Sequence, residues 1–266
     1  MIDLREPALE LIRHFGEQHV VAFFLVLARL TPLFLLAPLF SSRMVSARVR
    51  GIVAVALAVG IAPVVMQGQT LPLDALGIGE LVVKELLVGL AFAFALGALM
   101  AALTVAGTFL DYMIGYSFSG LVDPDNGVQA TVLNRLYGLF AVLIFIAING
   151  DHWVIQGIAR TYDLVSLSEM PALGPMVAGA TDVFVTIFAS AVQIAGPVML
   201  ALVLTDAAFG VISRVMPQLN VFMVGFPAKV VFGLLIIGTT LPFVGGWFVD
   251  ELQTSVAQAL RTLRVA

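Results

Sequence analysis

Six long apolar stretches alternate with short polar segments along the chain. Most are close to the length of about 20 residues that a helix needs to cross a bilayer. The second has about 16 residues, and the fourth reaches span length only when residues 149–155 are added to it. The pattern predicts an all-α, polytopic membrane protein, with stretches at Val20–Phe40, Gly51–Met66, Leu86–Leu110, Leu136–Ile148, Val183–Leu204 and Val221–Val249.

Polar and helix-breaking residues interrupt several of these stretches. The first contains Arg29 and Pro32, and the sixth contains Pro227, Pro242 and the pair Gly245–Gly246. Backbone groups freed at membrane depth are tolerated only where protein or a water-filled cavity covers them. We therefore expect broken helices and helical hairpins that pack against other helices rather than a simple lipid-facing bundle.

The composition narrows the class of protein further. The chain is 61% hydrophobic and 11% charged, whereas soluble domains have about 25% charged residues. This excludes a soluble enzyme, a disordered chain and a nucleic-acid binder with a basic face. A formal net charge of −4 gives no attraction for phosphate-rich partners, so nucleic acid is not expected as a partner. Without cysteine, a disulfide framework or a thiolate nucleophile is impossible.

Both ends of the chain carry amphipathic patterns. The first 19 residues are too acidic for a cleavable signal, and their apolar positions favour a short amphipathic helix leading into a retained first span. A solvated leader is the alternative. The C-terminal tail has its own apolar face, which would either pack on an assembly or lie on the lipid surface. The two faces are Leu4, Ala8, Leu11, Ile12 and Phe15, and Leu252, Val256, Leu260 and Leu263.

Arginines suggest an orientation for the first hairpin. The first loop carries Arg43, Arg48 and Arg50 with no acidic residue nearby, and the second loop is acidic. The positive-inside rule places the first loop in the cytoplasm and the N-terminus outside. Later loops carry no clear bias.

Small residues recur every fourth position in two stretches. Such stripes let helix backbones approach closely in a membrane, although Ala-rich and Gly-rich helices also show this spacing by chance. Phe92 and Phe94 lie off the stripe of the third stretch, where we expect them to face lipid or a partner. The stripes are Gly89, Ala93, Gly97 and Ala101, and Ala54, Ala58 and Ala62.

A few ionisable residues lie in apolar context. Charged side chains at membrane depth usually mark a substrate or ion pathway, or pair with another polar group. The alternative is that these positions never meet lipid. Adjacent residues point about 100° apart on a helix, so we expect Lys84 and Glu85 to find partners on other helices rather than each other. The spans carry no ladder of carboxylates for a proton relay. The residues concerned are Arg29, Lys84, Glu85, Asp111, Asp206 and Lys229.

Catalytic constellations are missing from the sequence. The histidines are His14, His19 and His152, and they form no HExxH motif. GxSxG and a Walker lysine are also absent. The acidic run from Asp123 to Gly127 lacks the spacing of a calcium loop and is typical of a turn. We expect no catalytic, cofactor or metal site.

The segment from Gly107 to Asn134 is the most informative. We read it as a loop that starts with an apolar helix and ends in a turn, with bulky apolar side chains placed among Gly107, Gly115 and Gly120. Such side chains on a glycine-flexible segment can fill a narrow hole and later move aside, a role that suits methionine. A loop that folds back onto its own core is the alternative. The side chains are Phe109, Tyr112, Met113, Tyr116 and Phe118.

Together with two other motifs, this segment resembles the FliR family of type III export-gate proteins, flagellar and injectisome. The other motifs are Ile148-Asn149-Gly150-Asp151-His152 and the Pro-Gln-x-Asn-x-Phe-x-x-Gly-x-Pro run that starts at Pro217 and is followed by Lys229. Ala47-Arg48-Val49-Arg50 fits as well, and the resemblance extends from about Ala37 to Pro242.

The resemblance implies a non-enzymatic core subunit of an export gate in the bacterial inner membrane, within the flagellar basal body. It implies partners FliP, FliQ, FlhB and FlhA, assembly into a closed helical ring partly lifted out of the bilayer, contact with membrane lipid, and unfolded flagellar subunits as cargo. Residues 1–266 would form one export-gate domain. Its residues from about 1 to 180 would resemble FliP, and those from about 181 to 266 the FliQ hairpin.

In the family a loop after the third apolar segment plugs the pore, and here that segment is Gly107–Leu121. The implied plug contacts are Phe109, Met113, Tyr116 and Phe118, followed by a turn at Asp123 and Pro124. The implied hairpin tip would face the cytoplasm and touch FlhB or FliQ, with contacts at Pro217, Gln218, Asn220, Gly225, Pro227 and Lys229.

Two alternatives stay open. Flagellar members often carry Glu where this chain has Thr108, and the acid at Asp111 is closer to the injectisome pattern. An injectisome subunit of the same family is therefore one alternative. From a different class, a stand-alone transporter or channel would need substrate-binding carboxylates in mid-span.

Overall fold

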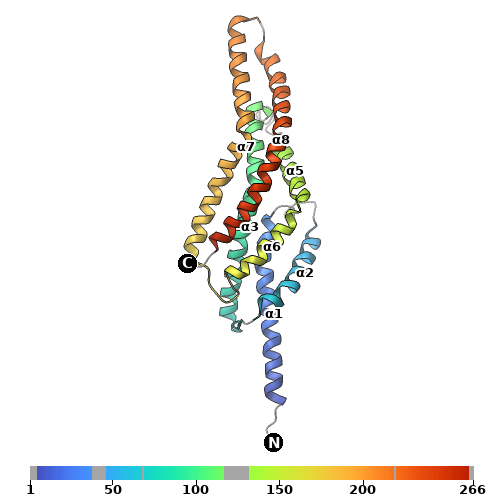
Figure 1. The fold of residues 1–266 in the computed structure, drawn as a ribbon, viewed down its shortest axis with the longest axis vertical. Coiled ribbons are helices and arrows are strands. Elements are labelled where there is room, and N and C mark those ends of the chain that lie inside the picture. Colours follow the sequence, from blue (N-terminus) through green and yellow to red (C-terminus); the bar gives the residue numbers. More distant parts are fainter. Residues whose placement is uncertain (1–4, 38–45, 68, 117–131, 219, 264–266) are drawn as a thin grey trace, which may run out of the picture. The chain divides into compact units, whose positions relative to one another are not determined.

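A computed structural model describes residues 5–37, 46–67, 69–116, 132–218 and 220–263. These ranges contain helices and no strand, so the prediction of an all-α protein is confirmed (Figure 1). The helices are α1 (Arg5–Leu36), α2 (Ala47–Val65), α3 (Ala75–Ile114), α5 (Val132–Ala147), α6 (Gly150–Leu164), α7 (Leu173–Val215) and α8 (Val221–Thr262).

Five of these helices are long and apolar enough to cross a membrane, and α5 with α6 makes a sixth candidate as one broken span. The break lies at Asn149, whose φ of 53° is left-handed. Asparagine tolerates this conformation better than most residues. The polytopic prediction is confirmed, and residues 149–155, which the fourth stretch needs to reach span length, follow a break that was not expected.

Three helices are much longer than a single crossing requires. α3, α7 and α8 have 40, 43 and 42 residues, which is about 60 Å at 1.5 Å per residue and about twice the hydrocarbon thickness. We expected Pro227 and Pro242 to break the sixth stretch, and this was wrong, because both lie inside α8. A proline removes one backbone hydrogen bond and kinks a helix without necessarily ending it.

The chain forms two compact units. Unit 1 comprises residues 1–97, 149–182 and 253–266, and unit 2 comprises residues 98–148 and 183–252. The helices α3, α7 and α8 each contribute to both units.

In unit 1, α1 and α2 pack side by side (Figure 1). The buried residues of α2 are its alanine stripe, Ala54, Ala58 and Ala62. The C-terminal tail is the end of α8 rather than a separate helix, and its Leu263 is buried with Val88 of α3. The two environments considered for this tail, another subunit or the lipid surface, are therefore corrected: its apolar face packs within its own chain.

In unit 2, α7 and α8 form an antiparallel hairpin. Phe209 lies by Gly225, Asp206 by Lys229, and Leu202 by Gly233. The residue numbers fall along α7 as they rise along α8, so the two helices run in opposite directions. The connection between the helices spans residues 216–220. Antiparallel neighbours joined by so short a link are typical of helical hairpins.

Candidate functional site

The predicted plug segment begins on a helix. α3 continues to Ile114 and ends at Gly115, whose φ is 99°, so the first part of the segment that we read as a loop is helical, in line with its apolar helical start. Phe109 and Met113 are both half-buried and, four residues apart, share one face of α3. Tyr116 follows the helix end and is also half-buried. Phe118, Asp123 and Pro124 lie outside the described residues.

The Asp111 side chain ties the end of α3 to the start of α5. One carboxylate oxygen accepts a hydrogen bond from the backbone N–H of Leu133 at 2.9 Å, and the other accepts from Asn134 at 3.0 Å. The first N–H groups of a helix have no partner inside it, and a negative charge there also interacts favourably with the helix dipole. Asp111 is 1% exposed, and these bonds supply the partners that a buried carboxylate requires.

A second set of bonds runs in the opposite direction. The Asn134 amide nitrogen donates to the backbone carbonyl of Thr104 and to the Thr108 hydroxyl, both at 2.9 Å. At Gly107 the two helices approach so closely that a β-carbon would lie 2.6 Å from the carbonyl oxygen of Leu133. This explains why a helix runs through Gly107: the glycine serves close approach rather than flexibility. We call the side chains of Thr108, Asp111 and Asn134, together with the backbone at Thr104 and Gly107, the α3–α5 clasp.

Unit 1 contains a buried ionic cluster around Arg29 of α1. Its guanidinium group binds both carboxylate oxygens of Glu85 on α3, and the Nη2–Oε1 distance is 2.9 Å. It also donates to the Thr161 hydroxyl at 3.1 Å and to the carbonyl oxygen of Val165 at 3.0 Å. Arg29 and Glu85 are both fully buried, and bidentate pairing of this kind is strong and geometrically specific.

Lys84 completes this cluster and corrects one expectation. Its ammonium group lies 2.6 Å from Glu85, so the two adjacent residues do pair with each other. The long, flexible lysine stem bridges the angle between the two side chains. Lys84 also donates to the carbonyl oxygens of Ser166 and Leu167 at 2.8 and 2.9 Å. The expected partners on another segment are therefore present as well.

Two residues of α6 that complete this cluster were not expected from the sequence. The Tyr162 ring lies under the Arg29 guanidinium at 3.9 Å, and Thr161 is fully buried. Nothing in their local spacing sets them apart from other polar residues. Asn134 was missed as well, although an amide in the first turn of an apolar helix is a signal for a buried hydrogen-bonding role.

The small-residue stripe of the third stretch lies partly against α1. A β-carbon on Gly89 would be 2.1 Å from the carbonyl oxygen of Arg29, and one on Gly97 would be 3.2 Å from that of Leu36. Ala93 is fully buried and Ala101 half-buried. Phe92, expected to face lipid or a partner, is fully buried instead, because Gly157 leaves room for its ring.

The residues of the predicted hairpin tip lie at and beyond the α7–α8 connection. Pro217, Gln218 and Asn220 are exposed, and the Asn220 carboxamide accepts from the N–H of Met223 at 3.3 Å, as a helix N-cap does. Gly225, Pro227 and Lys229 lie in the first turns of α8. The Lys229 ammonium group binds Asp206 at 2.8 Å, and 52% of the Asp206 side chain is exposed.

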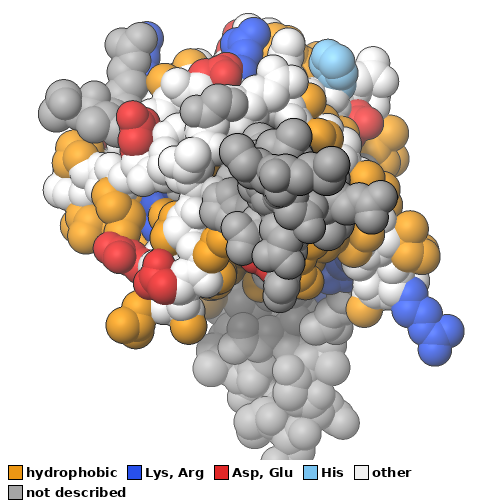
Figure 2. Space-filling view, turned by 90° about the horizontal axis from the view of Figure 1, so that it is seen from below, with side chains coloured by type: hydrophobic (Ala, Val, Ile, Leu, Met, Phe, Trp, Pro, Cys, Tyr) orange, Lys and Arg blue, Asp and Glu red, His pale blue; other side chains and the backbone are white. Residues whose placement is uncertain are grey.

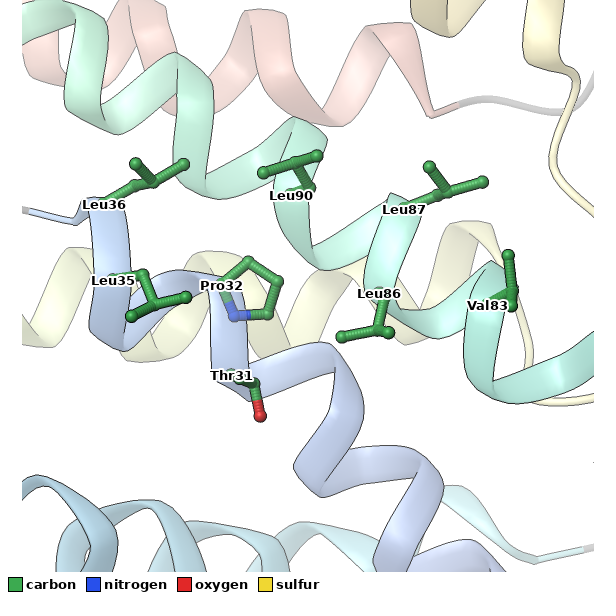
Figure 3. Close-up of a pocket in the computed structure, with 8 residues that line it drawn as sticks. All are labelled: Thr31, Pro32, Leu35, Leu36, Val83, Leu86, Leu87 and Leu90. Carbon is green, nitrogen blue, oxygen red and sulfur yellow. The ribbon is translucent and has the colours of Figure 1, made fainter. Parts of the chain in front are cut away.

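An apolar groove of about 460 Å³ lies between α1 and α3 in unit 1 (Figure 3). Leu35 and Leu36 project from the end of α1, and Leu86, Leu87 and Leu90 line the α3 side. Pro32, inside α1, also lines the groove, and the Thr31 hydroxyl donates to the carbonyl oxygen of Leu27 at 2.8 Å. The groove therefore presents hydrocarbon to whatever fills it.

Apolar side chains are common at the surface as well. Figure 2 shows hydrophobic side chains interspersed with a few charged ones on the face it presents. Large apolar side chains are exposed on many helices, Leu76 and Met223 by 87% and 77%, and so much apolar surface is typical of a protein covered by lipid or by partners. Among the described residues, no group of three His, Asp or Glu side chains is arranged to hold a metal ion.

Comparison with known proteins identifies the family. Residues 20–255 match the model of the bacterial export proteins, family 1. The flagellar biosynthetic protein FliR of Bacillus subtilis (strain 168) is 32% identical over 228 residues, which cover 84% of this chain and 88% of that protein.

Other relatives come from both branches of the family. The flagellar biosynthetic protein FliR of Escherichia coli (strain K12) is 28% identical over 222 residues, covering 84% of this chain and 85% of that protein. The surface presentation of antigens protein SpaR of Shigella sonnei is 29% identical over 221 residues, covering 80% and 82%. Because the family model spans nearly the whole chain, this protein belongs to family 1 of the bacterial export proteins.

Proposed function

We propose that the protein is a core subunit of the flagellar type III export gate, and that it forms and closes the pore through which unfolded flagellar subunits leave the cell. The observation that carries this proposal is the match to flagellar relatives over 84% of the chain. The role is structural and gating, without catalysis. Unfolded rod, hook and filament subunits are the proposed cargo.

The surface of the α7–α8 hairpin supports assembly with partners in the inner membrane. Asp206 is half exposed within a candidate span, and the exposed apolar side chain of Val203 lies three residues before it on the same helix face. A carboxylate in that setting is costly against hydrocarbon, so a partner or water covers it. We propose FliP, FliQ, FlhB and FlhA as the partners, with the hairpin tip from Pro217 to Lys229 contacting FlhB or FliQ.

The lengths of α3, α7 and α8 favour a position partly outside the bilayer. Helices of about 60 Å exceed the hydrocarbon thickness about twofold, and a ring lifted out of the membrane accommodates them. Within this ring, residues up to about 180 would take the place of a FliP-like subunit. Residues from about 181 would take the place of a FliQ-like hairpin.

Closure of the pore is assigned to the segment Gly107–Leu121, with Phe109, Met113, Tyr116 and Phe118 as plug contacts. Phe109 and Met113 support this role because they are large, apolar, half-buried and on one helix face. Replacing both with glycine removes the bulk that would seal a narrow passage. We expect ions and small solutes to leak through assembled gates that carry this pair of substitutions.

An injectisome role is the second candidate, because the SpaR relatives match almost as much of the chain. The two roles differ in cargo. In the native host, deletion of the gene should stop secretion of hook and filament subunits and abolish motility. Loss of another exported set with normal motility would establish the injectisome role instead.

Purification of the tagged chain from the same host tests assembly. Mass spectrometry of the intact complex should find FliP and FliQ bound. A stable monomer that moves a metabolite across vesicles would overturn the proposal in favour of a transporter.

Pore closure is tested separately by leakage. If gates carrying Phe109→Gly and Met113→Gly leak no more than the original gates, the plug assignment is removed.

A further inference from the structure

We propose that the α3–α5 clasp is a positioning device that sets the rotation of the end of α3 and thereby aims Phe109 and Met113. The inference rests on the proposed function in one respect: the direction of these two side chains matters because they are the proposed plug contacts. Its geometry comes from described residues of unit 2 alone. Asp111 and Asn134 are its positioning residues.

The clasp and the two bulky side chains occupy opposite faces of the same helix. Phe109 follows Gly107 by two residues, and Met113 follows Asp111 by two. Two residues turn about 200° around an α-helix. The face that holds α5 is therefore opposite the face that carries Phe109 and Met113, and fixing one face fixes the direction of the other.

The bonds of the clasp act in both directions, which makes it a rotational lock. Asp111 accepts two N–H groups of α5, while Asn134 of α5 donates to two oxygens of α3. Gly107 brings the backbones into contact between these bonds. A small rotation of α3 would break several bonds at once, including both described bonds of a buried carboxylate, which is costly.

A single cysteine can report the direction of the Met113 side chain. The chain has no cysteine of its own, so Met113→Cys introduces one thiol into this subunit. Its rate of modification by a membrane-impermeant maleimide is measured in purified, assembled gates. The background is either Asp111→Asn, which weakens the clasp, or Thr104→Val as the matched control.

Thr104→Val leaves the clasp intact. The Thr104 hydroxyl bonds within its own helix, to the carbonyl oxygens of Met100 and Ala101, and its clasp contact is the backbone carbonyl. Thr108→Val is a milder clasp variant, because it removes one acceptor of the Asn134 amide. It provides the measurement if Asp111→Asn gates fail to assemble.

Loss of a charge-assisted hydrogen bond changes an equilibrium about tenfold or more. We expect the half-buried thiol to react about tenfold faster in Asp111→Asn gates, faster to a smaller degree in Thr108→Val gates, and at the original rate in Thr104→Val gates. Equal rates in clasp and control backgrounds would overturn the positioning role. Ion leakage is recorded on the same gates: a faster thiol without leakage keeps the clasp and removes the plug assignment instead.

Discussion

The backbone of α3 at Gly89 lies directly against the backbone of α1 at Arg29: a β-carbon on Gly89 would be 2.1 Å from the Arg29 carbonyl oxygen. Glu85 lies four residues, about one helical turn, before Gly89 and binds the Arg29 guanidinium. The close approach at the glycine therefore brings the buried ion pair into reach.

Replacing Gly89 with alanine should destabilise unit 1. The new methyl group has backbone rather than a flexible side chain in its way, so α1 and α3 must separate and the Arg29–Glu85 bonds lengthen. Overpacking costs about 1–3 kcal/mol and occasionally more, and we expect the upper end. Thermal unfolding of the purified gate complex measures it.

The matched control for this substitution is Gly79→Ala on the same helix. A β-carbon there meets nothing within 4 Å, and alanine has the higher helix propensity by about 1 kcal/mol. The control should unfold at the original temperature or slightly above it. If both variants lost stability equally, contact between the α1 and α3 backbones at Gly89 would not be the cause.

Removing Glu85 should cost more than removing Arg29. Glu85→Gln leaves two buried cations, Arg29 and Lys84, without the carboxylate that binds both, and breaking a buried pair in this way costs about 3–5 kcal/mol. Arg29→Met leaves Glu85 with Lys84, which is 2.6 Å away, so the loss should be smaller. The same unfolding measurement ranks the two variants, and the reverse order would mean that Lys84 does not neutralise Glu85.

The Tyr162 hydroxyl should be dispensable while its ring is not. The hydroxyl is buried, and no protein group among the described residues bonds to it. The ring lies 3.9 Å from the Arg29 guanidinium carbon. Tyr162→Phe should keep or raise stability, by up to about 1 kcal/mol, whereas Tyr162→Leu loses the cation–π contact and about 1–2 kcal/mol.

Complex yield and unfolding temperature of the two Tyr162 variants provide the measurement. A loss of stability in Tyr162→Phe would indicate that the hydroxyl has a partner in the assembled gate.

Apolar length was enough to predict most of the fold. The six stretches follow from the distance a helix must span, whereas the break at Asn149 was not expected, although asparagine tolerates the left-handed conformation found there. Apolar length did not decide the role of Gly107, where a glycine could equally signal a flexible loop or a close helix contact. Only the position of α5 distinguishes the two readings.

Side-chain partners were beyond the reach of the sequence for a similar reason. Helical spacing gives the directions in which the Lys84 and Glu85 side chains leave the backbone. The four-carbon stem of lysine can bend back, however, and the Lys84 ammonium group does reach the Glu85 carboxylate. The amphipathic tail around Leu263 was recognisable as a packing face. A pattern of this kind states that a face is buried and not which surface buries it, here the cluster with Val88 and Met176.

The ion pair between Asp206 and Lys229 should matter for assembly far more than for folding. The pair closes at 2.8 Å, but half of the Asp206 side chain is exposed, and an exposed pair contributes about 0–1 kcal/mol. Asp206→Asn should therefore leave the hairpin folded. In the gate, a partner that covers this carboxylate would lose a desolvated, charged contact, and truncating such a contact costs about 2–5 kcal/mol. We expect the amount of co-purified partners to fall at least tenfold while the expression level of the chain is unchanged.

The double variant Asp206→Lys with Lys229→Asp is the control. It restores the ion pair within the chain but reverses the sign of the charge that a partner meets at position 206. If the reversal recovered assembly, the pair would serve the hairpin itself and the partner contact would lie elsewhere.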